Sequence, residues 1–290
     1  MMKPLIAITG NSGQLGKSLQ QISSNYPNYR FLFLSRQEID LGDLASIDRF
    51  FQDHKPNIFI NCAAYTAVDK AENEQTQALT ANAMAVSKIA QYCAKVNATL
   101  ITISTDYVFD GNGTTPYTIH EPTNPINYYG YSKCLGEKLA MQNNANTIVI
   151  RTSWVFAPHG SNFVKTMLRL LKEKAFIKVV SDQVGCPTYA PDLAEAIMHI
   201  VEQLPTNSKR GIYHFSNTGI ISWFEFASTI QQLTKIHCTV EPIPTSAYPT
   251  PAKRPSYSAM DLQDIQDDFG VQLTDWQTSL TKCLTALQEL

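Results

Sequence analysis

The stretch PLIAITGNSGQLGKSLQQIS (residues 4–23) runs from an apolar segment through a glycine-rich turn into an amphipathic segment. Its first apolar residues do not alternate with polar ones, which predicts a parallel strand covered on both faces. Gly10, Gly13 and Gly16 then give the spacing G-x-x-G-x-x-G at the junction with a helix. Glycine allows a tight turn close to a ligand, and a helix N-terminus attracts a pyrophosphate. We therefore predict a dinucleotide-binding turn here; a plain strand–helix turn is the alternative.

Strand-like and helix-like segments continue to alternate up to about residue 156. The apolar runs that predict further strands are 31–35, 57–64, 99–105 and 147–156. Helical patterns separate them at 43–53, at 74–95 and around Lys133 and Glu137. This alternation predicts an α/β fold, with a Rossmann-type doubly wound parallel sheet over residues 1–156.

The rhythm changes after residue 156, and we predict a smaller mixed α/β substrate-binding domain over residues 157–290. Its predicted helices span 162–173, 191–204, 222–233 with Ser222 as the N-cap, and 275–290. The proline-rich stretch 241–257 does not suit the interior of a helix or a sheet. The segment GIYHFSN (211–217) reads as a strand that could return to the first domain.

Composition narrows the class of protein. The chain has 290 residues and a net charge of −2, which gives no reason to expect a nucleic-acid or membrane partner. The first residues lack the pattern of a signal peptide, and no apolar run is long enough to span a bilayer. The six cysteines are far apart and the six histidines are scattered, so we expect free thiols and no zinc site. A cytoplasmic globular protein is the simplest expectation.

The end of the second predicted strand bears on the choice of dinucleotide. Sites selective for NAD usually have an acidic residue there, about 20 residues after the glycine turn. This chain has Ser35 and Arg36 instead, and a guanidinium suits a 2′-phosphate. We therefore predict NADPH as the cofactor, with NADH also accepted; a merely solvated Arg36 is the alternative. Asp40 could contact the adenine amine or cap the next helix.

The stretch NYYGYSK (127–133) places Tyr129 one helical turn before Lys133. An ammonium beside a phenol favours the phenolate and would lower the tyrosine pKa, which makes a usable proton donor. Thr105, at the carboxyl end of the fourth strand, supplies a hydroxyl at the same edge of the sheet. Together these groups suit hydride transfer to a ketone, although Y-x-x-x-K alone also arises by chance in packed aromatic segments.

Longer motifs make the chain resemble a known family. They are INCAAYTAVDKAE (60–72), STDYVFDG (104–111), NPINYYGYSKCLGE (124–137), RTSWVF (151–156), DQVGCPT (182–188), AYPTPAKRP (247–255) and TDWQ (274–277). With the glycine turn, they resemble the dTDP-4-dehydrorhamnose reductases of the extended short-chain dehydrogenase/reductase superfamily. The resemblance implies reduction of the C4 ketone of dTDP-4-dehydro-β-L-rhamnose by NAD(P)H to give dTDP-L-rhamnose.

The resemblance also implies roles for individual residues. Thr105, Tyr129 and Lys133 would be catalytic, with Tyr129 as the proton donor. Cofactor contacts are expected from these last two and from Gly10, Gly13, Gln14, Leu15, Gly16, Ser35, Arg36, Asp40, Leu41, Ala63, Ala64, Tyr65, Thr66 and Ser104. Substrate contacts are expected from Thr105, Asp106, Trp154 and Arg254. Arg254 could instead form a surface salt bridge, and Asp69, Lys70 and Glu72 read as a local polar network.

The chain departs from the family at two positions that affect its partners. Some members place acidic residues around Mg²⁺ at a dimer contact, where this chain has Ser18 and Pro191. Neither is a carboxylate ligand, which makes Mg²⁺ doubtful and favours a monomer or weak homodimer. The sequence leaves open a reductase of another nucleotide-linked 4-keto-6-deoxy sugar, or a non-catalytic binding subunit. A dehydratase fits less well, because Asp106 is followed by Tyr107 rather than a second acid.

Overall fold

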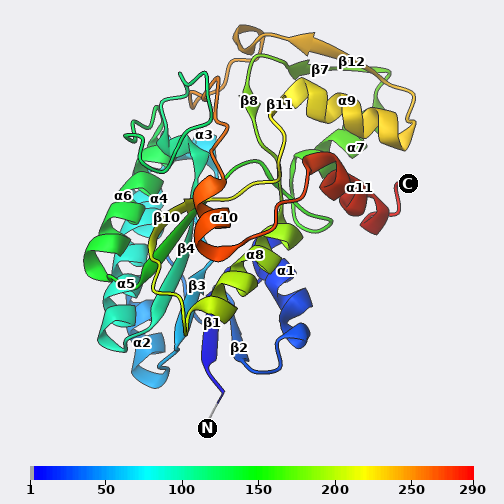
Figure 1. Cartoon of the computed structure of the whole chain (residues 1–290). Coiled ribbons are helices and arrows are strands. Elements are labelled where there is room, and N and C mark those ends of the chain that lie inside the picture. The colour runs from blue at the N-terminus through cyan, green and yellow to red at the C-terminus, as the bar shows by residue number, and fades with distance from the viewer. Residues whose placement is uncertain (1–2) are drawn as a thin grey trace.

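A six-stranded sheet forms the centre of the molecule in the computed structural model, which describes residues 3–290 (Figure 1). Its strands are β1 (Leu5–Thr9), β2 (Arg30–Leu34), β3 (Ile58–Asn61), β4 (Thr99–Thr105), β5 (Thr147–Thr152) and β10 (Gly211–His214). Their order is β10-β5-β4-β3-β1-β2, and every neighbouring pair is parallel. The predicted Rossmann-type sheet is therefore confirmed.

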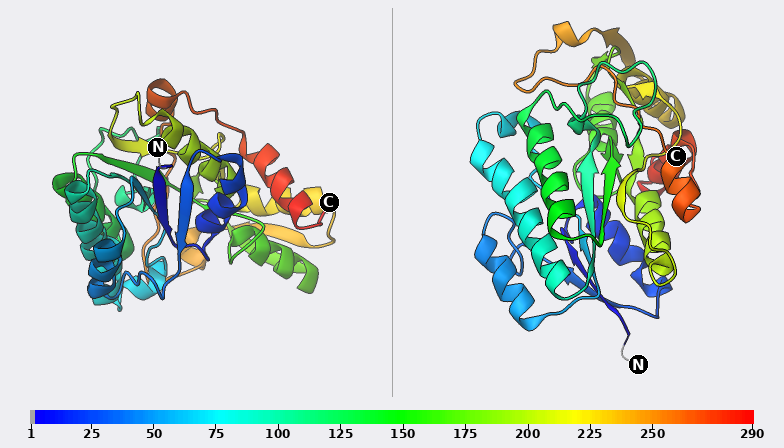
Figure 2. Two further views of the ribbon diagram at one scale, coloured as in Figure 1. Left: turned by 90° about the horizontal axis from the view of Figure 1, so that it is seen from below. Right: turned by 60° about the vertical axis from the view of Figure 1, so that its left-hand side comes forward.

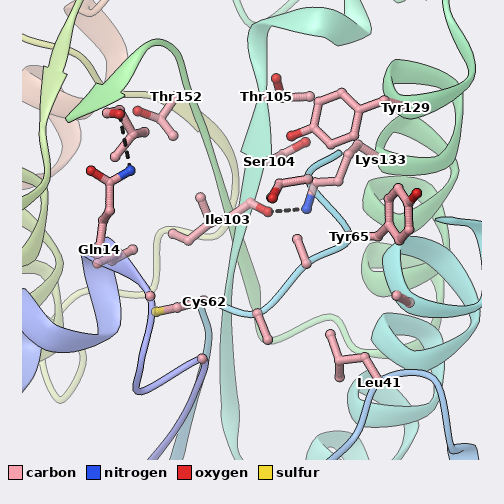
Figure 3. Close-up of a pocket in the computed structure, with 18 of the residues that line it drawn as sticks. Gln14, Leu41, Cys62, Tyr65, Ile103, Ser104, Thr105, Tyr129, Lys133 and Thr152 are labelled. Atoms are coloured by element: carbon pink, nitrogen blue, oxygen red, sulfur yellow. Dashed lines mark hydrogen bonds between the residues drawn. The ribbon is translucent and has the colours of Figure 1, made fainter. Parts of the chain in front are cut away.

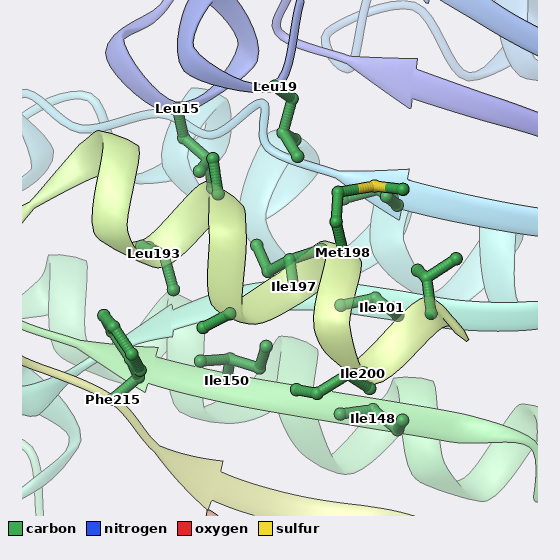
Figure 4. Packing of buried hydrophobic residues seen from close by; sticks show 14 of the residues in the cluster. Leu15, Leu19, Ile101, Ile148, Ile150, Leu193, Ile197, Met198, Ile200 and Phe215 are labelled. Carbon is green, nitrogen blue, oxygen red and sulfur yellow. The ribbon is translucent and has the colours of Figure 1, made fainter. Parts of the chain in front are cut away.

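Helices cover both faces of this sheet (Figures 1 and 2). One face carries α2 (Leu44–Asp53), α5 (Ala85–Lys95) and α6 (Tyr128–Asn143). The other carries α1 (Gln14–Ile22), α8 (Ala190–Gln203) and α10 (Gln263–Phe269). Figure 4 shows Leu193 and Ile197 of α8 packed over Ile150 of the sheet. Apolar strands covered on both sides explain why β1, β3 and β5 lack an alternating pattern.

Two predicted elements are interrupted where the structure approaches the carboxyl edge of the sheet. The helix predicted over 74–95 consists of α4 (Gln75–Leu79), a π-helical turn η2 (Thr80–Met84) and α5. The strand predicted over 147–156 splits into β5 and β6 (Val155–Phe156), because Trp154 between them has a left-handed backbone with φ 48°. Short helices α3 (Val68–Ala71), η1 (Ser23–Asn25) and η3 (Asp106–Val108) complete this half.

The second half of the chain forms a smaller layer beside the sheet. It contains α7 (Phe163–Glu173), α9 (Trp223–Thr234), α11 (Trp276–Ala286) and η4 (Thr245–Ala247). Its short strands are β7 (Phe176–Val180), β8 (Val184–Gly185), β9 (Thr188–Tyr189), β11 (Ile221–Ser222) and β12 (Thr239–Ile243). Ser222 caps α9 as predicted and forms a capping box with Glu225. Because β12 lies in a two-stranded sheet, Pro242 is accommodated at an edge.

The two halves of the chain are interleaved. Strand β10 pairs with β5, and α8 packs on the large sheet although both follow residue 157. The smaller layer has its own core, built around Phe156, Leu168 and Phe226. The domain boundary at residue 156 stays a prediction. No helix among residues 3–290 is long and apolar enough to cross a membrane.

Candidate active site

A cavity of about 1140 Å³ lies at the carboxyl ends of the parallel strands, where the two halves meet. Figure 3 shows Thr105, Tyr129 and Lys133 on one side and Gln14 on another. The predicted site residues that line it are Gly10, Gly13, Gln14, Leu15, Arg36, Asp40, Leu41, Ala63, Ala64, Tyr65, Thr66, Ser104, Thr105, Asp106, Tyr129, Lys133 and Trp154. Gly16, Ser35 and Arg254 are not among its lining residues. Residues distant in sequence thus converge on one site.

The glycine turn after β1 requires glycine at two positions. Gly10 has φ 71°, and a Cβ there would lie 2.9 Å from the amide nitrogen of Ala63. A Cβ on Gly16 would lie 2.1 Å from the carbonyl oxygen of Gly10, so Gly16 lets α1 pack against the turn. Gly13 precedes α1, and no side chain caps this helix start. No side chain at the N-cap therefore occupies the first amide groups of α1, and Gly13, Gln14 and Leu15 line the cavity.

Gln14 connects the glycine turn to the second half of the chain. Its amide nitrogen donates to the carbonyl oxygen of Val155 at 3.2 Å, and its amide oxygen accepts from Asn162 at 2.9 Å. The ring of His159 also hydrogen-bonds the main-chain oxygen of Gln14 at 2.8 Å. These bonds fix the mouth of the cavity on that side.

Of the two candidate cofactor residues after β2, Arg36 lines the cavity and Ser35 does not. Arg36 is 83% exposed and pairs with Asp40 across 3.0 Å, between Nε and Oδ2. The other carboxylate oxygen of Asp40 accepts from the amide of Gly42 at 2.8 Å. Ser35 lies outside the cavity lining, and its amide donates to Glu38 at 2.7 Å. Arg36 is thus the cation at this corner of the cavity, and Asp40 orients it.

Asn82, in the π-helical turn η2, was not singled out by the sequence reasoning. Its side chain accepts from the amide of Tyr65 at 2.9 Å and donates to the carbonyl oxygen of the same residue at 3.0 Å. It also donates to the Ser132 hydroxyl on α6 at 3.0 Å. A buried asparagine inside an otherwise apolar helical segment was the available signal. This residue ties the loop after β3 to the helix that carries Tyr129.

Tyr129 and Lys133 both face the cavity from α6, but their electrostatics differ from the prediction. Burial raises the pKa of Tyr129 to about 12, and a hydrogen bond with Thr105 offsets this only in part. The expected lowering of this pKa by Lys133 is therefore wrong for this structure. The Lys133 ammonium donates instead to the carbonyl oxygen of Ile103 at 2.6 Å (Figure 3). Burial lowers the pKa of Lys133 to about 8.

Asp106 has an unusual environment for a carboxylate. Its side chain is buried, and Oδ1 accepts from the Thr105 hydroxyl at 3.0 Å. Its Oδ2 is buried and has no hydrogen-bond partner within residues 3–290. Burial raises the pKa of Asp106 to about 6, although the hydroxyl groups of Ser258 and Thr105 favour the charged carboxylate and oppose the shift. Asp106 lines the cavity, and a buried oxygen without a protein partner calls for one from a bound water or ligand.

Part of the cavity wall is aromatic. Trp154, predicted from sequence, stacks on Trp223, which was not. Trp223 is the first residue of α9, and its ring also contacts that of Phe163, with ring centroids 4.6 Å apart. The sequence around 223 resembles an ordinary amphipathic helix start, so no local signal marked this residue.

Arg254 lies in an ion pair beside the cavity. Its guanidinium donates to both carboxylate oxygens of Asp69, at 2.9 and 2.8 Å. Glu72 accepts from the amide of Tyr128 at 2.8 Å. The expected local network of Asp69, Lys70 and Glu72 stays a prediction. Asp69 instead bonds segment 252–254 and Glu72 the start of α6, both far away in the sequence.

The side chains that could bind a metal ion are scattered over residues 3–290. No group of three or more His, Cys, Asp or Glu side chains within residues 3–290 could hold a metal ion. Ser18 donates its hydroxyl to the main-chain oxygen of Gln14. All six cysteines are free, as predicted.

Comparison with known proteins places the chain in a family. The model of the RmlD substrate binding domain matches residues 2–289. The chain is 40% identical over 283 residues to a dTDP-4-dehydrorhamnose reductase of Aggregatibacter actinomycetemcomitans, covering 95% of this chain and 96% of the relative. It is 38% identical over 280 residues to the spore coat polysaccharide biosynthesis protein SpsK of Bacillus subtilis, covering 96% of each.

Solved structures agree with this placement. A dTDP-4-dehydrorhamnose reductase from Clostridium acetobutylicum superposes with a TM-score of 0.93 at 37% identity, over 98% of this chain and 99% of the other. The reductase from Bacillus anthracis, solved in complex with NADP, gives a TM-score of 0.91 at 38% identity over the same shares. Its sheet and its cavity agree with these matches, and the chain therefore belongs to the RmlD family of dTDP-4-dehydrorhamnose reductases.

Proposed function

We propose that this chain reduces the C4 ketone of dTDP-4-dehydro-β-L-rhamnose to dTDP-L-rhamnose, with NADPH as the preferred reductant and NADH also accepted. The observation that carries this proposal is the convergence of Thr105, Tyr129 and Lys133 on the cavity that also meets the glycine turn. Full-length similarity to named reductases supports the substrate.

The residues of the glycine turn fit a dinucleotide. A side chain at Gly10 would collide with the chain at Ala63, so only glycine allows this turn, and the turn lines the cavity in front of α1. The helix start carries no side-chain cap, and its amide groups suit phosphate oxygens. Arg36 would meet a 2′-phosphate, which favours NADPH. Bound reduced nicotinamide would supply the hydride.

Proton transfer would come from Tyr129. Because its pKa is about 12, the phenol stays protonated at neutral pH and can donate to the developing alkoxide of the sugar. Thr105 would hold the same oxygen through its hydroxyl. Lys133, protonated below its pKa of about 8, would stabilise the phenolate that remains after transfer.

Binding of the sugar would use the two walls beside this group. Asp106 would accept a sugar hydroxyl through the oxygen that has no protein partner. The Trp154 ring offers a flat apolar surface to the sugar, supported by Trp223. Arg254 would reach a diphosphate oxygen only by exchanging its contacts with Asp69.

A coupled assay tests the proposal. The protein is incubated with dTDP-4-keto-6-deoxyglucose and a 3,5-epimerase, and the absorbance of NADPH and of NADH is followed in separate reactions. We expect oxidation of both, faster with NADPH, and a dTDP-6-deoxyhexose product identified by NMR as the L-rhamno isomer. Oxidation that needs no epimerase would point to a reductase of another 4-keto sugar. No oxidation with any such sugar, despite dinucleotide binding, would favour a binding subunit.

A further inference from the structure

Glu137 lies one helical turn beyond Lys133 on α6 and is 4% exposed. It pairs with Arg151 of β5, which is 2% exposed, through two bonds of 2.7 and 3.0 Å. Burying a carboxylate is costly unless it is paired and hydrogen-bonded. The fork of the arginine meets both carboxylate oxygens, so the position of this carboxylate is closely defined.

A third contact joins the same carboxylate to the edge of the cavity. The Ser104 hydroxyl donates to Glu137 Oε1. Ser104 precedes Thr105 at the end of β4, and it lines the main cavity. Glu137 therefore holds three elements together, α6, β4 and β5, one helical turn along α6 from Lys133.

Lys133 meets the same end of β4 from the neighbouring turn of the helix. Its ammonium donates to the carbonyl oxygen of Ile103, the residue before Ser104. A small second cavity of about 10 Å³ lies between, lined by residues that include Lys133, Ser104 and Glu137. The ammonium and the carboxylate thus flank one short piece of main chain.

We propose that Glu137 is a positioning residue for Lys133: held by Arg151 and Ser104, it fixes the helix face that carries Lys133 against the end of β4 and supplies the negative charge that keeps the buried ammonium protonated. This inference rests on the proposed reductase function, in which the charged form of Lys133 assists Tyr129. It assigns a task to a buried ion pair that the proposed chemistry does not otherwise use.

The charged groups around Lys133 support the proposal that Glu137 keeps its ammonium protonated. Burial lowers the pKa of Lys133, and the carboxylate of Glu137 is the charge that opposes the shift. Asp106, from η3, acts on the neighbouring Tyr129, and Asn82 from η2 is uncharged.

Arg151 and His214 are the other titratable groups around the carboxylate of Glu137. Arg151 also lies over the ring of Phe109, with Cζ 5.1 Å from the centroid, and Nη1 is 3.4 Å from Nε2 of His214 on β10. The pKa of His214 is lowered to about 3, so this ring is neutral at working pH. Glu137 is therefore the acidic group that the structure places next to the ammonium on α6.

The test compares variants that separate charge from packing. Glu137→Gln keeps the shape of the side chain and removes its charge, whereas Glu137→Asp keeps the charge and shortens its reach to Arg151. The alkaline limb of kcat for sugar reduction is measured for each. We expect the limb of Glu137→Gln to move to lower pH by on the order of one unit, because an opposite charge next to Lys133 is lost. The limb of Glu137→Asp should stay close to that of the unmodified protein.

A second readout does not depend on turnover. The titration of the Lys133 amine is followed by NMR in protein labelled with ¹⁵N-lysine, and the signal is assigned by its absence in Lys133→Met. We expect the same downward shift in Glu137→Gln and not in Glu137→Asp. If a reductase assay fails but this shift is seen, the function is wrong and the positioning role stands.

A double variant keeps the test possible if Glu137→Gln alone does not fold. Glu137→Gln/Arg151→Met removes both buried charges, which is often tolerated better than leaving one unpaired. It too should titrate Lys133 at lower pH. An unchanged titration and an unchanged alkaline limb in folded Glu137→Gln, or in the folded double variant, would reduce Glu137 to a structural ion pair and overturn the proposal.

Discussion

Trp154 and Trp223 stack face to face, with ring centroids 3.5 Å apart and planes 11° apart. Trp154 follows β5 with a left-handed backbone, and Trp223 opens α9 in the other half of the chain. Both line the cavity. A left-handed conformation is unfavourable for a bulky residue and persists where its surroundings fix it. The stack is therefore part of what holds the Trp154 ring at the cavity wall.

Replacing Trp223 with leucine should weaken sugar binding. Loss of the stacking partner removes roughly 0.5–1.5 kcal/mol of aromatic interaction and leaves Trp154 unsupported. We expect the KM for the dTDP sugar to rise by roughly 2- to 12-fold, with a smaller change in kcat. Trp276→Phe is the matched control: Trp276 is buried in the same apolar cluster but does not line the cavity, so it should lower the melting temperature without changing KM. Equal KM values in both variants would contradict the assignment.

Tyr129→Phe removes one hydroxyl and keeps the ring, which packs edge-on against Tyr107 with centroids 5.7 Å apart. We expect kcat to fall by about 10²–10⁴-fold, the usual contribution of a positioned acid. The dissociation constant of NADPH, measured by fluorescence, should stay within about twofold, since only a hydroxyl is lost.

Tyr131→Phe is the control for this variant, because Tyr131 lies on the same helix and is 48% exposed. It should behave as the unmodified protein. A comparable loss of turnover in both variants, or a loss of NADPH binding in Tyr129→Phe, would show that Tyr129 serves the structure of the helix.

Asp106→Asn should separate stability from function. The folded-state pKa of about 6 lies above the ordinary value of 3.8, so the ionised carboxylate destabilises the fold above pH 6, and this cost fades as the pH falls toward 4. The variant should therefore melt at an equal or higher temperature than the unmodified protein at pH 8, and this advantage should shrink below pH 6. Because the proposed acceptor for a sugar hydroxyl is lost, KM for the sugar should rise at least about tenfold.

Asp110 provides a control for the direction in which the Asp106 variant changes stability. Hydrogen bonds lower the pKa of Asp110, so Asp110→Asn should lose stability at pH 8 where Asp106→Asn does not. Thermal unfolding of the three proteins between pH 4 and pH 8 checks both directions. Identical behaviour of the two variants would rule out burial of the Asp106 charge as the cause.

Arg36→Ala tests the dinucleotide preference. The guanidinium is exposed at the cavity corner and tethered by Asp40, so it can turn toward a 2′-phosphate. We expect KM for NADPH to rise by roughly tenfold, the value of one charge-assisted contact, while KM for NADH stays within about twofold. Steady-state kinetics with each cofactor measure this. Equal effects on both would mean that Arg36 does not read the phosphate.

Much of the fold could be predicted because its signals are local. The unalternating run at 4–10 and the spacing of Gly10, Gly13 and Gly16 follow from burial of a parallel strand and close packing of a helix on a turn. The Ser222 cap is equally local, since its partner Glu225 is three residues away.

The parts that sequence reasoning missed depend on distant contacts. Trp223 became part of the site only because α9 brings it onto Trp154. The pKa of Tyr129 was predicted from its neighbour on the helix, whereas burial by the whole fold decides it. A one-dimensional pattern shows which groups share a helix face, but not how far they are removed from water.

His214 should make the fold sensitive to acid. The ring is 1% exposed, its Nδ1 bonds the carbonyl oxygen of Asp261 at 3.1 Å, and burial together with Arg151 lowers its pKa from 6.5 to about 3. The folded protein keeps the ring neutral, while the unfolded chain takes up a proton below pH 6.5. The free energy of unfolding therefore falls between pH 6.5 and 3 by up to about 1.4 kcal/mol per pH unit.

His214→Gln removes this contribution of the histidine. The free energy of unfolding in urea is measured at pH 7 and at pH 5, and the drop between them should be about 2 kcal/mol smaller in the variant than in the unmodified protein. His120→Gln, at an exposed position, should leave the pH dependence unchanged. Parallel losses in all three proteins would mean that other groups carry the acid sensitivity.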